Sequence, residues 1–332
     1  MAGKKIAVVT GGAGFIGSHM VDLLLNEGFQ VRVIDNLTGG RLANLAHHKS
    51  NTDLTVDTRD LRSLKPDDKL FSDAQFVFHY AGKGDIVPSI VQPLEYMSVN
   101  VMGTIHALEC ARAAKVQKFV YAASSSCYGL TDELPTKETS LIKAEYPYAL
   151  SKYQGEMATF HWGKVYNLPV NSVRIFNAYG PRSKTTGAYG AVFGVFLAQV
   201  LANKPLTVVG DGTQTRDFVF VKDLVRAFYE VAKSAPTLEM YNVGAGKPQS
   251  VNRLVELLGA KEIVHLPKRP GEPDCTWADI TKITTSTKWR PQVSFEDGVN
   301  EMLKNIDYWR EAPVWDPESI KAATADWFNY LS

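Results

Sequence analysis

A glycine cluster directly after the first apolar run constrains this chain more than any other feature. Residues 6–10 are typical of a β-strand, and Gly11, Gly14 and Gly17 follow before an amphipathic stretch at 14–27. Glycines here let the backbone turn sharply, approach a pyrophosphate and pack the helix against a sheet. The helix N-terminus then offers free N–H groups and a positive dipole to phosphates. The pattern predicts dinucleotide binding, although tight turns alone explain many glycine clusters.

The end of the next apolar run indicates which dinucleotide to expect. Asp35 follows the run 30–34 and lies 18 residues beyond Gly17, close to the roughly 20 expected of an acid that binds the adenosine ribose. A carboxylate there would repel a 2′-phosphate, which favours NAD over NADP, although Arg41 nearby leaves NADP open. The alternative is that Asp35 only opens the following turn.

Short β-branched runs alternate with helical patterns through the first two thirds of the chain. Near-continuous apolar strands separated by helices are typical of a parallel sheet covered on both faces. We therefore expect an α/β fold, a doubly wound, Rossmann-like parallel sheet, with ligands beyond the carboxyl ends of its strands. The expected strands are 6–10, 30–34, 76–79, 118–122 and 169–175, and the expected helices include 14–27 and 95–114.

The pattern changes after about Gly180, where turn-rich segments and shorter helices begin and lead to an amphipathic stretch at 295–309 and an aromatic tail. This predicts a smaller C-terminal α/β substrate-binding lobe. Residues 218–232 and 240–243 still resemble pieces of the α/β core. We expect a dinucleotide-binding domain at 1–178, with returning segments at about 213–245, and the lobe at 179–212 and 246–332.

Two tyrosines lie four residues before a lysine, and only one of them has a catalytic context. Pro147 suits the first turn of a helix, and Tyr148 and Lys152 would share one helix face. A cation there, above all beside an oxidised nicotinamide, would lower the phenol pKa and make Tyr148 a proton acceptor. Tyr229 and Lys233 have the same spacing but no hydroxyl-rich partner segment. We interpret Tyr229 as a core residue.

The partner segment of Tyr148 is a run of three serines. Ser124, Ser125 and Ser126 follow a predicted strand, which would place their hydroxyls at the sheet edge where ligands bind. They could hydrogen-bond a reacting hydroxyl of the substrate. The alternative is that serines at a strand end only cap backbone groups.

Composition excludes several classes of function. The chain has 332 residues and a net charge of +1, which argues against nucleic-acid binding by charge. Three cysteines are too few for a disulfide framework, and seven histidines form no ligand pattern, so we expect no metal site. Neither a signal-type leader nor an 18-residue apolar run occurs. We expect a soluble, cytoplasmic protein without a membrane partner.

With these residues in place, the chain resembles the extended short-chain dehydrogenase/reductase family, and most of all the nucleotide-sugar 4-epimerases that act on UDP-sugars. The resemblance covers nearly the whole length. Its motifs are GGAGFIGS at 11–18, DN at 35–36, NVMGT at 100–104, SSSCYG at 124–129, YALSK at 148–152, RIFNAYGPR at 174–182, GDGTQTRDFVFVKD at 210–223 and RPGEPDCTWAD at 269–279.

The resemblance implies a role for each matching residue. Ser124 would bind the substrate 4-hydroxyl, Tyr148 would be the base, and Lys152 would hold the nicotinamide ribose. Further cofactor contacts would come from Phe15, Ile16, Asn36, Asp57, Thr58, Ala81, Gly82, Lys83 and Asn100. Substrate contacts would come from Ser125 and Ser126, and Asn177, Arg216 and Arg269 would contact the nucleotide diphosphate end. Planar cations suit diphosphate oxygens, while a solvated surface ion pair is the alternative for both arginines.

Departures from the family pattern narrow the reaction. Related 4,6-dehydratases carry an Asp-Glu pair where this chain has Ser125 and Ser126, which cannot act as carboxylate acid and base. Thr276 replaces a bulky tyrosine found in some members and would leave room for an N-acetyl group. The stretch 187–192 also resembles epimerases that prefer N-acetylated sugars, and Lys83 is unusual in its loop.

The sequence therefore predicts an NAD-dependent 4-epimerase of a UDP-hexose or UDP-N-acetylhexosamine that works through a transient 4-keto sugar. A 4,6-dehydratase or reductase of the same family is the first alternative, and a non-catalytic NAD-binding or sensing protein is the second. The apolar faces of 91–114 and 148–165 predict a homodimer, as the resemblance implies. Burial of these faces in a monomer core is the alternative to that interface.

Overall fold

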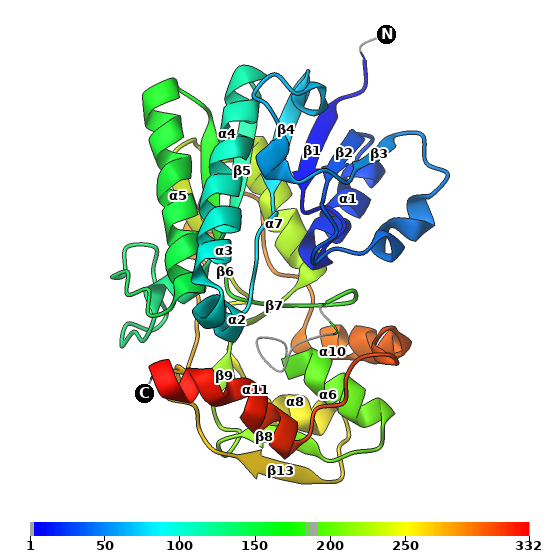
Figure 1. Cartoon of the computed structure of the whole chain (residues 1–332), viewed down its shortest axis with the longest axis vertical. Helices are drawn as coiled ribbons and strands as arrows, with labels where there is room; N and C mark the ends of the chain where they lie inside the picture. Colours follow the sequence, from blue (N-terminus) through cyan, green and yellow to red (C-terminus); the bar gives the residue numbers. More distant parts are fainter. Residues whose placement is uncertain (1–2, 184, 186–191, 332) are drawn as a thin grey trace.

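Seven parallel strands form the central sheet of the computed structural model, which describes residues 3–183, 185 and 192–331 (Figure 1). The order across the sheet is β11-β6-β5-β4-β1-β2-β3, and every pairing is parallel. The strands are β1 (Ile6–Thr10), β2 (Gln30–Ile34), β3 (Leu54–Asp57), β4 (Ala74–His79), β5 (Lys118–Ser124), β6 (Val170–Ile175) and β11 (Glu239–Val243). The predicted doubly wound α/β fold is confirmed.

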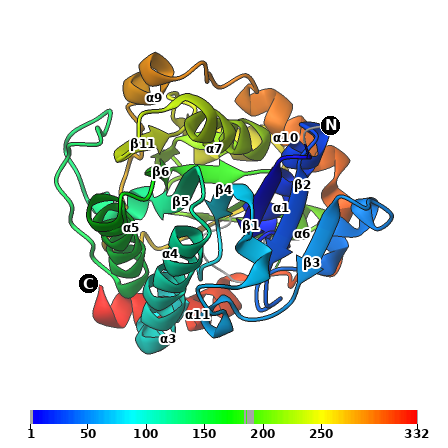
Figure 2. The same cartoon turned by 90° about the horizontal axis from the view of Figure 1, so that it is seen from above.

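Helices cover both faces of the sheet (Figure 2). On one face, α1 (Phe15–Asn26) and α7 (Val221–Ser234) bury Met20 and Leu224 against strand residues such as Val9. On the other, α4 (Gly103–Ala113) lies beside α5 (Pro147–Tyr166), and Leu108 packs in the same core cluster as Val8. Because successive strand residues face opposite sides, Ala7 and Val9 pack on one face and Val8 on the other, and all three are buried.

The helix predicted at 95–114 is three segments, α3 (Pro93–Met97), a π-helical turn at Ser98–Met102 and α4. The π turn centres on Asn100, whose carbonyl accepts a hydrogen bond from the Thr104 hydroxyl at 2.6 Å. Apolar periodicity does not distinguish one π turn within an α-helix, since the helix continues on either side. The turn matters because it aims Asn100 at the loop after β4.

A second group of elements lies beyond the carboxyl ends of the strands and carries its own core (Figure 1). Tyr179, Phe193, Phe218 and Phe295 form a cluster of stacked and edge-to-face rings there. The helices are α6 (Val192–Leu201), α8 (Val251–Leu257), α10 (Phe295–Lys304) and α11 (Pro317–Tyr330), with paired short strands β7 (Asn177–Tyr179) and β10 (Phe218–Phe220), β8 (Leu206–Val209) and β13 (Ile263–Leu266), and β9 (Thr215–Arg216) and β12 (Gln249–Ser250).

Short helices fill the connections between these elements. They are α2 (Ile86–Val91), α9 (Thr281–Ser286), and the 3₁₀ turns Leu42–His48, Leu61–Ser63, Lys69–Phe71, Ser125–Tyr128 and Ile306–Trp309. Within the described residues, no helix has the length and apolar character needed to cross a membrane.

Two elements differ from the sequence expectations, and one further segment joins the sheet core. β3 was not predicted; it is a strand of four residues at the sheet edge, where its side chains are partly buried or exposed. The aromatic tail is the amphipathic helix α11, which begins with Pro317 and a capping box at Asp316. The segments 218–232 and 240–243 do return to the sheet, and so do Ile283 and Trp289, which belong to the sheet core. We propose that residues 281–289 also belong to the dinucleotide-binding domain.

Candidate active site

A groove of about 1200 Å³ runs along the carboxyl ends of the sheet strands, between the sheet and the second lobe. It brings together residues that lie far apart in the sequence. Those of the predicted site that line it are Gly11, Gly14, Phe15, Ile16, Gly17, Asp35, Asn36, Ala81, Gly82, Lys83, Ser124, Ser125, Ser126, Tyr148, Lys152, Asn177, Arg216, Arg269 and Thr276.

The glycine-rich loop at one end of this groove is packed against other backbone. Gly11 has φ +68°, and a Cβ there would lie 2.7 Å from the amide nitrogen of Ala81. A Cβ on Gly17 would overlap the carbonyl oxygen of Gly11. Helix α1 starts after Gly14 with no side chain capping its first N–H groups. Backbone donors with no side chain in front of them fit a dinucleotide pyrophosphate.

Asp35 holds the turn that follows β2, which was the alternative to cofactor binding, and it also lines the groove. Its Oδ1 accepts a hydrogen bond from the Leu37 N–H at 2.9 Å, and its Oδ2 accepts one from the Ala13 N–H at 2.9 Å. The carboxylate thus joins the glycine loop to the turn after β2. Arg41, the cation near Asp35 that could accommodate the 2′-phosphate of NADP, donates to the Thr185 hydroxyl at 2.6 Å.

Three residues assigned to the cofactor do not line the groove. Asp57 accepts hydrogen bonds from the backbone and side chain of Arg59, and Thr58 lies beside it. The groove is lined there by residues 59–62 instead. Asn100 is buried beneath the groove, where it accepts from the Lys83 N–H at 2.7 Å. This geometry gives Asn100 a supporting position, because it holds the loop of Ala81–Lys83 without facing the cavity.

Tyr148 and Ser124 meet as the motif spacing predicts. The Tyr148 hydroxyl donates to Ser124 Oγ at 3.3 Å, and Ser124 Oγ lies 2.7 Å from Ser126 Oγ. Tyr148 is flanked by Tyr146, stacked at 6.4 Å between ring centroids, and by Tyr96 edge-on at 6.4 Å. Ser124 also caps the following turn by accepting from the Ser126 N–H. The capping role of Ser124 is therefore present, and its hydroxyl also contacts Tyr148.

Burial controls the protonation of this pair in the protein itself. It raises the pKa of Tyr148 above its usual value, and the hydrogen bond to Ser124 opposes the shift. It lowers the pKa of Lys152 to about 7. Lys152 Nζ lies 4.5 Å from the Tyr121 ring centroid and next to Gly82. In the protein without a cofactor, Lys152 therefore does not lower the pKa of Tyr148, contrary to the prediction.

The far end of the groove contains both predicted arginines and one acid that the sequence analysis missed. Arg216 donates to Glu272 at 2.8 Å, and Arg269 lies 3.8 Å from the other oxygen of Glu272. Both arginine side chains are largely buried, so neither forms a solvated surface pair. Thr276 donates its hydroxyl to Asn177 Oδ1 at 2.7 Å. These four predicted residues lie on the same side of the groove as Glu272.

Tyr229, in the second Tyr–Lys pair, is a core residue as predicted. Tyr229 is 9% exposed, belongs to the sheet core and donates to Glu27 at 2.9 Å. Lys233 covers its ring at 4.7 Å. Residues 186–191, which include most of the stretch that resembles N-acetyl-preferring epimerases, lie outside the described residues.

Comparisons with known proteins identify the family of this chain. A family model described as GDP-mannose 4,6 dehydratase matches residues 8–302. The chain belongs to this family of extended short-chain dehydrogenases/reductases. A putative UDP-glucose 4-epimerase of Methanocaldococcus jannaschii is 34% identical over 89% of this chain and 96% of its own length.

Solved structures of family members superpose closely. A UDP-N-acetylglucosamine 4-epimerase from Methanobrevibacter ruminantium, in complex with UDP-N-acetylmuramic acid, matches with TM-score 0.87 and 30% identity over 92% of this chain and 99% of that one. A UDP-glucuronic acid 4-epimerase from Bacillus cereus, in complex with UDP-glucuronic acid and NAD, matches with TM-score 0.84 and 31% identity over 91% and 99%. Relatives also include UDP-glucuronic acid decarboxylases and a dTDP-glucose 4,6-dehydratase.

The low pKa of Lys152 predicts a pH-dependent stability. The folded protein loses the Lys152 proton at about pH 7, whereas the unfolded chain keeps it to about 10.5. The unfolded state therefore binds more protons between these values, and stability rises with pH across that window. Lys152→Met should stabilise the protein by a few kcal/mol at pH 7 and lose this advantage as the pH rises, measured by urea unfolding from pH 6.5 to 9.5. Lys164→Met, at an exposed position of the same helix, is the control. Equal pH dependence in both variants would contradict the prediction.

Proposed function

We propose that this chain inverts C4 of a UDP-hexose or UDP-N-acetylhexosamine, with NAD held in the groove. The observation that carries the proposal is the hydrogen bond between the Tyr148 hydroxyl and Ser124 Oγ at the carboxyl end of β5. A sugar hydroxyl that contacts both oxygens would replace this bond by one bond to each. The glycine loop, Asp35 and Lys152 line the adjacent part of the groove and suit a dinucleotide.

Each residue then has a defined task. Tyr148 takes the proton of the sugar 4-hydroxyl while Ser124 orients that hydroxyl, and the proton returns to the sugar oxygen when C4 is reduced. NAD supplies the hydride acceptor and donor for C4, so no net oxidation occurs. Protonated Lys152 favours the tyrosinate. Its pKa of about 7 leaves that charge sensitive to its surroundings.

The diphosphate end of the substrate is assigned to the two arginines near Glu272. Arg216 and Arg269 converge on that carboxylate, and a diphosphate offers the same oxygen geometry with more charge. A firm hold at this end and a loosely held sugar would let the 4-keto sugar turn its other face to the cofactor.

The two residues after Ser124 argue against a 4,6-dehydratase. Ser125 and Ser126 line the groove beside Ser124, and neither supplies the carboxylate acid and base of a 4,6-dehydratase. The close placement of Ser124, Tyr148 and Lys152 also supports an active enzyme over a non-catalytic NAD-binding protein, since binding alone does not need that arrangement.

The test is to incubate the purified protein with UDP-glucose, UDP-N-acetylglucosamine and UDP-glucuronate and to identify products by NMR. We expect the 4-epimer of at least one of the first two sugars, with no added reductant. Tyr148→Phe should lower kcat by about 100- to 10,000-fold because it removes the proton acceptor.

Tyr229→Phe is the matched control, since it alters the tyrosine with the same spacing to a lysine and should leave kcat unchanged. A 4-keto-6-deoxy product would replace the proposal by dehydration, and a product formed only with stoichiometric NADPH would indicate a reductase. An unchanged rate in Tyr148→Phe would remove Tyr148 from the mechanism.

Thr276 is proposed to set which sugar enters. Its small side chain faces the groove beside Asn177, so Thr276→Tyr should fill the space for a C2 N-acetyl group. We expect kcat/KM for UDP-N-acetylglucosamine to fall about tenfold or more relative to UDP-glucose. Thr276→Ser keeps the hydroxyl and the space and should keep the wild-type ratio. An equal loss for both sugars in Thr276→Tyr would argue against this role.

We also propose that the chain forms a homodimer through α4 and α5. Helix α5 exposes Leu150, Met157, Val165 and Tyr166, and Met102 is exposed at the end of the π turn that leads into the adjacent α4. Burying such a face stabilises association. Light scattering should give twice the chain mass of 36.7 kDa. Met157→Glu should shift the mass to the monomer, while Leu141→Glu, at another exposed leucine, should not. A dimer in Met157→Glu would place the interface elsewhere.

A further inference from the structure

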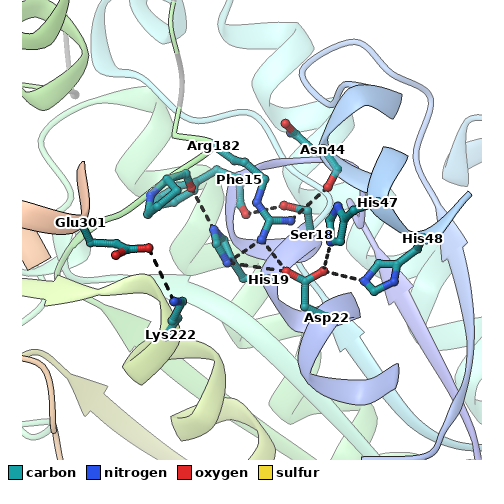
Figure 3. A network of polar contacts seen from close by, with 11 residues as sticks. Phe15, Ser18, His19, Asp22, Asn44, His47, His48, Arg182, Lys222 and Glu301 are labelled. Atoms are coloured by element: carbon teal, nitrogen blue, oxygen red, sulfur yellow. Dashed lines mark hydrogen bonds and ion pairs between the residues drawn. The ribbon is translucent and has the colours of Figure 1, made fainter. Parts of the chain in front are cut away.

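Two adjacent histidines and an aspartate from a different helix converge outside the groove (Figure 3). His47 and His48 end the 3₁₀ turn Leu42–His48, and Asp22 lies on α1. The Nε2 atoms of His47 and His48 lie 2.7 and 2.8 Å from the same oxygen, Asp22 Oδ1. The two imidazole rings are 4.1 Å apart between centroids. A single carboxylate oxygen and two imidazole nitrogens thus face one point.

The other oxygen of the carboxylate is already held. Arg182 donates to Asp22 Oδ2 and also to the backbone carbonyl of Asn44 at 3.0 Å. His19 lies nearby but uses Nε2 on the Pro181 carbonyl and Nδ1 on Arg182 (Figure 3). These contacts fix the orientation of Asp22 and leave Oδ1 directed at the two histidines. His47 is half-exposed, so a dissolved ion can reach the cluster.

We propose that Asp22, His47 and His48 bind one divalent transition-metal ion of the zinc type. The three candidate ligand atoms lie within 4.8 Å of one another, and a tetrahedral ion with bonds of about 2.0–2.2 Å needs little more than a rotation of the rings. Each neutral imidazole carries its proton on Nδ1 when Nε2 binds the metal. A water molecule completes the coordination.

The donor set determines the class of ion. Two imidazole nitrogens and one carboxylate oxygen suit Zn²⁺, Co²⁺ or Ni²⁺, whereas Mg²⁺ and Ca²⁺ prefer oxygen donors. The neighbouring Arg182 already balances the single carboxylate charge. A hard cation that depends on several carboxylates is therefore disfavoured here.

A bound ion would tie together two segments that shape the groove. Helix α1 begins at the glycine loop, and the 3₁₀ turn Leu42–His48 follows residues 35–41, all of which line the groove. Asn44 already links them by donating to the Ala13 carbonyl at 2.8 Å. We expect the ion to stabilise this junction whether or not the protein is an epimerase.

Calorimetry with ZnCl₂ tests the proposal on the purified protein. We expect one ion per chain, and an affinity about 10- to 100-fold lower for His47→Ala and for His48→Ala. His161→Ala changes an exposed histidine on α5 and is the matched control, expected to bind like the wild type. Zn²⁺ should also raise the unfolding temperature of the wild type and of the control by mass action.

Co²⁺ provides a second readout that reports coordination geometry. Tetrahedral binding should give a visible absorption band in the wild type that is lost in His48→Ala, and MgCl₂ in excess should not displace it. The proposal is overturned if both histidine variants bind Zn²⁺ as tightly as the wild type, or if the band persists in them. His47→Gln, a polar change at an exposed position, covers the case in which an alanine variant fails to fold.

Discussion

The contact between the glycine-rich loop and the backbone after β4 supports most of the functional geometry. Gly11 leaves only 2.7 Å between its missing Cβ position and the Ala81 nitrogen, so the two loops that line the cofactor side of the groove pack backbone to backbone. Any side chain there would clash with the backbone of Tyr80 and Ala81. Helix α1 packs against the same loop through Gly17, where a Cβ would overlap the Gly11 carbonyl oxygen, and α1 also carries Asp22.

Hydrogen bonds from backbone N–H groups to buried polar side chains hold the other walls of the groove. Asp35 joins the glycine loop to the turn after β2, and Asn100 holds the Lys83 backbone from below. Both groups sit at low exposure, where an unpaired polar group is costly. Their bonds therefore constrain the loops more strongly than similar bonds at the surface would.

Burial and charge oppose one another at the proposed catalytic pair. Burial keeps the phenol of Tyr148 protonated and lowers the pKa of Lys152 to about 7. A tyrosinate needs added positive charge at this position, which an oxidised nicotinamide beside Lys152 would supply. The site would then favour proton removal only with its cofactor bound, which agrees with a reaction that begins by oxidising the sugar.

The sequence by itself determined the first two strands to the residue, the helix after the glycine loop, and the position of Tyr229 in the sheet core. Those features depend on near neighbours in the chain, where periodicity, glycine spacing and helix geometry act directly. Only the tertiary structure decided the π turn at Asn100, the position of Glu272 between Arg216 and Arg269, and the meeting of Asp22 with His47 and His48. Such contacts join segments that are distant in the chain, and their geometry exists only after the sheet and its loops have packed.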